Sequence, residues 1–327
     1  MRRNITLFLL LLFFSVAQAQ QATQYSLYML NKYNFNPAYA GLDNSLSITG
    51  VYRKQWVDLP GSPESQNLTA HMPVYILGGG IGINIENDFI GAERTTSAQL
   101  SYNYWMPLNK TSLLSIGIGG GLVQKSLDGA ELRAPEGEYD PTEPIIEHND
   151  GRLPTSMVNT IVPTVSAGIY LQTEKLDIGI SANNLIESTA NLDFQDNTTD
   201  IQLKRNYFFI FAYSFEIGNT LTLHPSLFAK SDFNEHQVEI STILRYNDNI
   251  FGGASFRGYN SKSIDAVVLI AGFKLNEKVS FGYAYDLTLS DLSNVSRGSH
   301  EIILNYNLNK PIGAGVPPNI IYNPRFL

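Results

Sequence analysis

Apolar and polar positions alternate along most of this chain. Ile81, Ile83 and Ile85, for example, are separated by small or polar residues. The same period of two recurs in 100–106, 207–215, 238–246, 279–285 and 302–308. Such a period places apolar side chains on one face of a β-strand and polar side chains on the other. The pattern therefore predicts an all-β protein.

The predicted strands are longer than those of soluble proteins. A soluble β-sandwich also alternates, but its strands usually contain about 5–6 residues, whereas tilted membrane strands need roughly 9–11. The pattern predicts about fourteen strands: 45–57, 65–74, 77–86, 95–107, 111–124, 161–172, 176–184, 203–217, 220–230, 237–246, 250–258, 263–275, 278–286 and 299–309. Their length favours a membrane protein.

The composition of the two faces supports the same interpretation. The apolar rows end in Tyr, Phe or Trp, which is typical of the aromatic girdles at the two membrane interfaces. The opposite rows contain Gly, Ser, Thr and Asn, which suit a polar lumen. We therefore expect a transmembrane, antiparallel, up-and-down β-barrel.

The connections between strands give an independent indication. Tight turns such as Asn109-Lys110, Gly218-Asn219 and Asn247-Asp248-Asn249 fall at every second connection. The intervening connections are mostly longer: 58–64, 87–94, 125–160, 185–202, 231–236, 259–262 and 287–298. Short turns in the periplasm and longer loops outside the cell are typical of outer-membrane barrels. This predicts that both termini are periplasmic.

The N-terminus carries the features of a secretory signal peptide. Arg2 and Arg3 precede an apolar run at 5–14, and small residues then lead to Ala19. The run is too short for a spanning helix, which needs roughly 20 apolar residues. The expected division is a signal peptide at 1–19, a short periplasmic segment at 20–44 that could plug the barrel, the barrel at 45–309, and a periplasmic tail at 310–327.

Charge and cysteine content exclude several functions. Without Arg2 and Arg3, the chain has 20 basic residues (22 less two) against 30 acidic ones, a net charge of −10. Nucleic-acid binding needs a basic face, so we expect none. The absence of cysteine excludes disulfides, thiolate nucleophiles and zinc–sulfur sites. The sequence has no metalloprotease, phosphate-loop or serine-hydrolase motif, and its five histidines are scattered. We expect no enzyme activity, cofactor or metal.

Two features have alternative interpretations. The glycines at 78–80 and 117–121 lie inside strands and open no helix, which favours close packing or barrel curvature over phosphate binding. The loop 125–160 is strongly acidic. It is either a solvated loop, a docking surface for a basic partner, or a lid bridged by calcium, since hard cations prefer clustered oxygens.

Three stretches together resemble the PorP/SprF family of type IX secretion system membrane proteins. They are QYSLYMLNKYNFNPAYAG at 24–41, YRKQWVDLPGSPESQNLTAHMPV at 52–74, and SFGYAYDLTLSDLSNVSRGSHEIILNY at 280–306, with NPRFL at the end. The matching positions are Asn36, Pro37, Ala38, Tyr39, Gly41, Arg53, Gln55, Trp56, Tyr285, Asp286, Ser290, Leu292, Ser293, Gly298, Ser299, His300 and Glu301.

The resemblance implies an outer-membrane barrel of the type IX secretion and gliding machinery. It implies a role in secretion and surface attachment of a large adhesin with a type B C-terminal domain. The implied partners are that adhesin, other periplasmic or outer-membrane components of the system, and membrane lipid. The motif residues are candidates for partner binding or for barrel closure. Asp286 and His300 flank the loop 287–298, and we expect them to face one another in the lumen.

Other functions stay open at this point. Fourteen strands can enclose a lumen, so a transport channel, porin-like or for small hydrophobic compounds, is the main alternative. A barrel lipase or protease is a third, but no convincing Ser–His–acid set stands in the sequence. Bilayer conductance separates a channel from a docking barrel.

Overall fold

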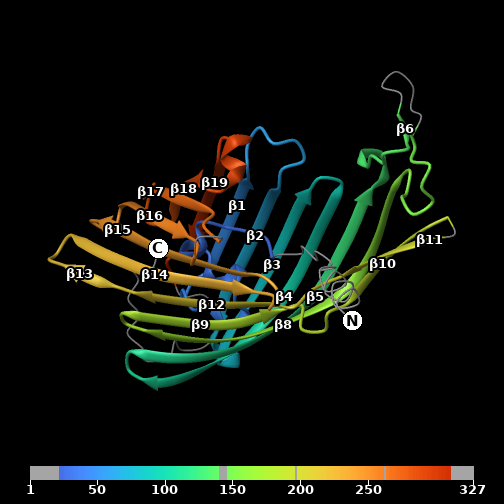
Figure 1. Cartoon of the computed structure of the whole chain (residues 1–327). Coiled ribbons are helices and arrows are strands. Elements are labelled where there is room, and N and C mark those ends of the chain that lie inside the picture. The colour runs from blue at the N-terminus through green and yellow to red at the C-terminus, as the bar shows by residue number, and fades with distance from the viewer. Residues whose placement is uncertain (1–21, 140–145, 196, 261–262, 311–327) are drawn as a thin grey trace, which may run out of the picture.

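A single antiparallel sheet closes on itself in the computed structural model, which describes residues 22–139, 146–195, 197–260 and 263–310 (Figure 1). The strands follow one another around the wall in chain order, and β1 pairs with β19. The cylinder is closed because β12 pairs with both β9 and β14. The expected signal peptide, and the expected tail beyond residue 310, lie outside the described residues.

The wall contains the predicted fourteen strands, one of them interrupted. They are β1 (Ser47–Lys54), β2 (Glu64–Val74), β3 (Gly79–Ile90), β4 (Glu93–Asn109), β5 (Ser112–Asp128), β8 (Met157–Thr173), β9 (Leu176–Asn183), β12 (Asn206–Tyr213) with its continuation β13 (Phe215–Ile217), β14 (Leu221–Ser231), β15 (His236–Tyr246), β16 (Ile250–Arg257), β17 (Ala266–Lys274), β18 (Val279–Thr288) and β19 (Ser299–Asn307).

The remaining elements are short. Two hairpins stand apart from the wall: β6 (Glu138–Tyr139) with β7 (Ile146–Glu147), and β10 (Thr189–Phe194) with β11 (Asn197–Gln202). Six 3₁₀ turns are η1 (Tyr28–Leu30), η2 (Lys32–Asn34), η3 (Pro37–Tyr39), η4 (Tyr75–Leu77), η5 (Gly129–Glu131) and η6 (Asp291–Asn294). No helix of the described part is long and apolar enough to cross a membrane.

Several predicted boundaries were wrong. The predicted strand 203–217 is interrupted at Ser214, whose N–H donates to the Lys175 carbonyl at 2.8 Å. The first strand ends at Lys54, so Trp56 lies in the following turn with a positive φ of 42°. The expected loop at 87–94 is mostly strand, because β3 and β4 leave only 91–92 between them. Backbone pairing does not require an apolar row, so strands continue where the hydrophobic signal stops.

The two ends of the barrel differ as the connections predicted. We call the end with 55–63, 91–92, 129–156, 184–205, 232–235, 258–265 and 289–298 the long-loop rim. The opposite end, the short-turn rim, has the connections 75–78, 110–111, 174–175, 218–220, 247–249 and 275–278. β4, β5 and β8 contain 17 residues each and rise beyond the rest of the wall at the long-loop rim (Figure 1).

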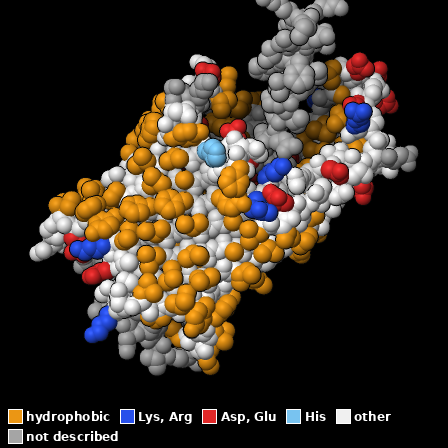
Figure 2. Space-filling model, turned by 60° about the horizontal axis from the view of Figure 1, so that its bottom comes forward, with side chains coloured by type: hydrophobic (Ala, Val, Ile, Leu, Met, Phe, Trp, Pro, Cys, Tyr) orange, Lys and Arg blue, Asp and Glu red, His pale blue; other side chains and the backbone are white. Residues whose placement is uncertain are grey.

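The outer surface of the wall is apolar. In β12, Tyr207, Phe209 and Phe211 face outward, whereas Phe208 and Ile210 are buried inside, so the predicted orientation of this row is confirmed. Figure 2 shows hydrophobic side chains covering the visible wall, with few charged side chains among them. Such a band is what contact with lipid tails requires.

Candidate functional site

The N-terminal segment 22–44 lies inside the lumen, and we call it the plug. Of the two expected locations, periplasm or lumen, the structure therefore shows the second. Nearly every residue from Tyr25 to Leu42 is buried, and only Met29 and Leu30 among these are partly exposed. The plug begins near the long-loop rim, where Lys230 donates to the Ala22 carbonyl at 2.8 Å. It leaves at the short-turn rim, where the Tyr75 hydroxyl donates to the Asn44 carbonyl at 3.2 Å.

Asn36 shapes the plug and ties it to the wall. Its side-chain oxygen accepts a hydrogen bond from the Ala38 N–H at 2.9 Å, so it caps η3, and Pro37 occupies the first position of that turn. The Asn36 amide also donates to the carbonyls of Ile169 and Ile180 at 3.1 and 3.2 Å. One side chain thus connects the plug to β8 and β9.

Gly41 and Tyr39 hold the following turn. Gly41 has a positive φ of 71°, and a Cβ there would lie 2.8 Å from the Met72 carbonyl oxygen. Its N–H donates to Nδ1 of His71 at 3.1 Å. The Tyr39 hydroxyl donates to Asp43 at 2.8 Å, and its ring meets that of Tyr170 edge-on. Only glycine fits the turn at this distance from β2.

Small residues of the wall make room for the plug. A Cβ on Gly80 would lie 2.2 Å from the Ala40 carbonyl oxygen, and one on Gly117 would lie 2.5 Å from the Ala38 nitrogen. Beside them, the Asn103 amide donates to the carbonyls of Ala38 and Ala40 at 2.6 and 2.8 Å. These glycines therefore serve close packing, which confirms that interpretation of the glycine clusters at these positions.

An ionic cluster anchors the start of the plug. It consists of Ser26, Arg53, Arg257, Asp286 and Glu301, all of which are buried. Arg53 donates to Asp286 at 2.8 Å and to Glu301 at 3.1 Å, and Arg257 also donates to Asp286 at 2.8 Å. The Ser26 hydroxyl donates to Asp286 at 2.8 Å and accepts from both arginines.

The plug backbone takes part in the same cluster. Glu301 accepts from the N–H groups of Ser26 and Leu27 at 2.7 and 2.9 Å. Glu239 of β15 accepts a hydrogen bond from Nε of Arg257, which belongs to the neighbouring strand β16, at 2.7 Å. Buried charges are tolerated where they are paired and hydrogen-bonded, and removing one partner is costly. The cluster therefore joins the plug to β1, β16, β18 and β19.

Aromatic packing complements these polar contacts. The rings of Tyr28 and Phe228 stack at 4.8 Å, and Phe35 lies 5.6 Å from Phe208. The Tyr28 hydroxyl also bonds to Ser226 and Ser241 at 2.9 Å. Elsewhere in the plug, burial raises the pKa of Tyr33 to about 12. Together, the side chains of the plug and of the inner wall form a packed core inside the lumen.

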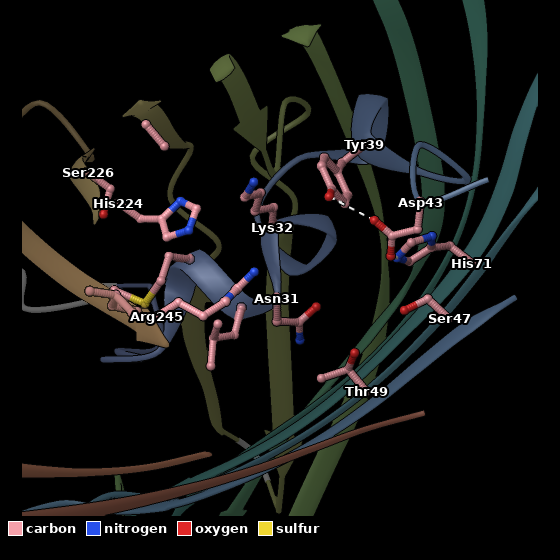
Figure 3. A pocket seen from close by; sticks show the side chains of 14 residues that line it. Asn31, Lys32, Tyr39, Asp43, Ser47, Thr49, His71, His224, Ser226 and Arg245 are labelled. Carbon is pink, nitrogen blue, oxygen red and sulfur yellow. Dashed lines mark hydrogen bonds and ion pairs between the residues drawn. The ribbon is translucent and has the colours of Figure 1, made fainter. Parts of the chain in front are cut away.

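Two cavities lie on opposite sides of the plug, and no residue lines both. The one near the short-turn rim has a volume of about 60 Å³. Figure 3 shows Asn31 and Lys32 between His224 and Arg245 on one side and Tyr39 and Asp43 on the other. Lys32 is also paired with the buried Asp177 at 2.5 Å.

The second cavity faces the long-loop rim and has a volume of about 180 Å³. Glu86 in its wall accepts from the hydroxyls of Thr23 and Tyr25 at 2.8 and 3.1 Å. Glu93, in the same wall, pairs with Lys125. The plug thus separates the two cavities and makes hydrogen bonds to the walls of both.

The structure brings some motif residues together and separates others. Asp286 and Glu301 meet Arg53 in the ionic cluster, but the expectation that Asp286 faces His300 is wrong. Asp286 is paired with Ser299 in the ladder, so His300 points to the opposite, outer face. There its ring nitrogen bonds to the Tyr283 hydroxyl at 2.6 Å.

The other candidates lie in the rim loops. The backbone N–H of Trp56 donates to the Ser299 hydroxyl at 3.1 Å, where the loops 55–63 and 289–298 meet. Ser290, Leu292 and Ser293 lie in or beside η6, and the Ser293 N–H donates to the Ser290 carbonyl. The first contact joins two rim segments and the second lies within one loop, and neither contact involves the plug.

Sequence reasoning missed Ser26, Lys32, Asp177, Glu239 and Arg257. The only signal was a charged residue on the lumenal row of a strand, as at Asp177, Glu239 and Arg257. In the acidic loop, no group of three or more His, Asp or Glu residues is placed to hold a metal ion, as far as the loop is described.

Comparison with solved structures identifies the fold. The CymD monoaromatic hydrocarbon channel aligns with a TM-score of 0.50 at 14% identity, covering 89% of this chain and 94% of that one. The toluene transporter TbuX of Ralstonia pickettii aligns with a TM-score of 0.49 at 11% identity, covering 86% and 92%. Omp33 of Acinetobacter baumannii aligns with a TM-score of 0.43 at 9% identity, covering 81% and 98%.

Among curated proteins, no sequence matches the chain. A family model does match, over residues 17–306, and its description is type IX secretion system membrane protein PorP/SprF. The match includes the plug, the ionic cluster and all strands of the wall. The closed wall, its apolar outer surface and this match agree, and the chain is an outer-membrane β-barrel that belongs to the PorP/SprF family of type IX secretion system membrane proteins.

Proposed function

We propose that this barrel is a plugged docking component of the type IX secretion system, which supports the secretion and cell-surface attachment of a large adhesin. The observation that carries the proposal is the plug. Residues 22–44 fill the lumen and are joined to the wall by buried charges, amides and aromatic rings. A lumen occupied in this way favours binding at the rims over passage through the barrel.

Family membership supports the choice of partners. A membrane protein of a secretion system is expected to contact other components of that system as well as the exported substrate. We propose the adhesin, further components of the system and the surrounding lipid as its partners, with the long-loop rim facing the outside. In this role the protein binds and carries out no catalysis.

The alternative is a transport channel. CymD, which shares the fold, is described as a monoaromatic hydrocarbon channel, but at 14% identity the likeness concerns the fold alone. A channel would require the plug to leave its many partners. Conductance of the purified protein in a planar bilayer distinguishes the two: a docking barrel gives no sustained current, whereas a channel does.

The direct test is deletion of the gene. We expect at least one large exported protein to disappear from the cell surface and to accumulate in the medium or the periplasm. Surface proteins of the deletion strain, the parent and a complemented strain are compared by protease shaving and mass spectrometry. An unchanged set of surface proteins would contradict the proposal.

A further inference from the structure

Among the described residues, the wall has one long stretch of strand that is paired on one side only. β8 pairs with β5 along its whole length, from Met157 to Thr173, but with β9 only from Ala167 to Gln172. The half of β8 at the long-loop rim, 157–166, therefore has an open edge. Among the described strands of the wall, no other unpaired edge is comparably long.

The backbone groups on the open side can be assigned from their neighbours. The Val165 carbonyl accepts from the Leu185 N–H at 2.9 Å, and the Pro163 carbonyl accepts from the Ser188 hydroxyl at 2.7 Å. Along a strand, the backbone N–H and C=O groups of successive residues are directed alternately to the two neighbouring strands. In β8, those of the odd-numbered residues are therefore directed away from β5. Met157, Asn159 and Ile161 thus direct their N–H and C=O groups to the open side. No backbone hydrogen bond to the described residues is made there.

Pro163 agrees with this assignment. Proline has no N–H and is tolerated in a sheet where that group would face away from the ladder. Its position in β8 is odd-numbered, so the missing donor belongs to the open side, and the pairing with Leu122 of β5 is kept. The edge from 157 to 161 retains its donors and acceptors.

This edge lies at the outer end of the lipid-facing band, where Met157 and Ile161 are still exposed on the outer face. On the outer face of β5, Ile118 and Leu122 are more than half exposed, and Gln124 and Ser126 follow them. Ile161 is paired with Gln124, and the residues before it lie farther out. Figure 1 shows this part of the wall rising above its surroundings. An exported polypeptide can therefore reach the edge from the aqueous side.

The hairpin β10–β11 leaves the edge unpaired. Ala190 of β10 packs with Val162 and Val123, which belong to the lumenal rows of β8 and β5. Ladder pairing of β10 is with β11 alone. The hairpin thus packs against β8 from the lumenal side, and a supported edge lowers the ordering cost of binding.

The charge around the edge selects the kind of segment that fits. The neighbouring loop, as far as it is described between 128 and 156, carries six carboxylates and two guanidinium groups. The carboxylates are Asp128, Glu131, Glu136, Glu138, Glu147 and Asp150, and the guanidinium groups are those of Arg133 and Arg152. Such a field attracts a basic partner.

We propose that the open edge of β8 at 157–161 binds an extended, basic segment of the exported protein, which adds a strand to the wall. This inference rests on the proposed function and names the surface at which the substrate docks. Main-chain hydrogen bonds to Met157, Asn159 and Ile161 supply the affinity, and the acidic loop supplies the preference for basic side chains.

The test uses proline at an edge-facing position. Ile161→Pro removes an N–H on the open side and leaves the β5 ladder intact, as Pro163 does two residues later. Ile161→Val keeps the backbone and is the matched control. The substrate is first defined as the exported protein that the deletion strain loses from its surface. Both variants are then expressed in that strain, and barrel folding is checked by heat-modifiable migration.

We expect Ile161→Pro to lower surface retention of that protein about tenfold, since one edge hydrogen bond is lost and the docked strand is displaced. Ile161→Val should retain the wild-type amount. A photo-crosslinking residue at position 159 should join the barrel to the same protein. Retention that is unchanged in Ile161→Pro overturns the inference, as does crosslinking of position 159 to a second copy of the barrel. If the deletion strain loses no surface protein, the proposed function fails instead.

Discussion

Arg53 and Glu301 face each other across the pairing of the first and last strands, with 3.1 Å between the guanidinium and carboxylate groups. They lie 248 positions apart in the chain and meet only because the barrel closes. Glu301 also accepts two backbone N–H groups of the plug. Closure of the wall and occupation of the lumen are therefore parts of one arrangement, and disturbing either should disturb the other.

Replacing Arg53 tests this coupling. Arg53→Met leaves Arg257 as the one cation that contacts Asp286 among the described residues, and it removes the cation from Glu301. Breaking a buried pair in this way costs about 3–5 kcal/mol, because a buried charge is left uncompensated. We expect a loss of that size in the free energy of unfolding, measured by urea titration in lipid vesicles. Lys54→Met is the control, since Lys54 is partly exposed and its contact with Glu64 is longer, at 3.4 Å. Equal losses in both variants would contradict the role of the cluster.

The glycines of β5 allow a test of how closely the plug is packed. A Cβ on Gly117 would collide with the Ala38 backbone, whereas one on Gly120 would meet nothing within 4 Å. Gly117→Ala should therefore destabilise the protein by about 1–3 kcal/mol through overpacking, and Gly120→Ala should not. A displaced plug should also show itself as current steps in a planar bilayer for Gly117→Ala only. Current from both variants would indicate a looser plug. The absence of current from both variants would indicate the same if their stabilities are also equal.

The orientation of β12 makes a third prediction. Phe211 faces lipid, and Ala212 lies inside. Phe211→Arg should impair insertion by up to about 2–4 kcal/mol, the cost of a charge on the lipid face near the midplane. Ala212→Ser, a small polar change on the lumenal face, should leave insertion intact. The folded fraction after dilution from urea into vesicles measures both. Full folding of Phe211→Arg would show that the register is shifted by one residue.

The sequence predicted the wall better than the lumen. Lipid demands an apolar side chain at every second position, so the facing of Phe211 could be predicted from a period of two. The partner of Arg53 could not, because a charge on the lumenal row has the same local pattern whether it is solvated or paired. Ser26 carries no local signal at all, and it meets Arg257 only after the chain has closed on itself.

The error at His300 has a different cause. His300 belongs to the row of Ile302 and Leu304, which face outward in β19, whereas Asp286 belongs to the buried row of β18. The ladder pairs Asp286 with Ser299, which places His300 out of phase with Asp286. The alternation at 302–308, continued by two residues, places position 300 on the apolar row, so the strand pattern predicts the face that the motif comparison missed. The motif at 285–301 therefore located the right part of the wall but assigned one of its members to the wrong side.

The last prediction concerns which rim faces the outside. The chain has no cysteine, so a single introduced thiol reports its own surroundings without further changes. Asn234 is exposed on the long-loop rim, and Asn219 is exposed in a short turn at the other end. We expect a membrane-impermeant maleimide to label Asn234→Cys on intact cells, and to label Asn219→Cys only after the outer membrane is opened. The reason is that outer-membrane barrels have short turns in the periplasm and longer loops outside the cell. Labelling of both residues after lysis controls for reactivity. The reverse pattern on intact cells would place the open edge of β8 in the periplasm, and a substrate already at the cell surface could not reach it.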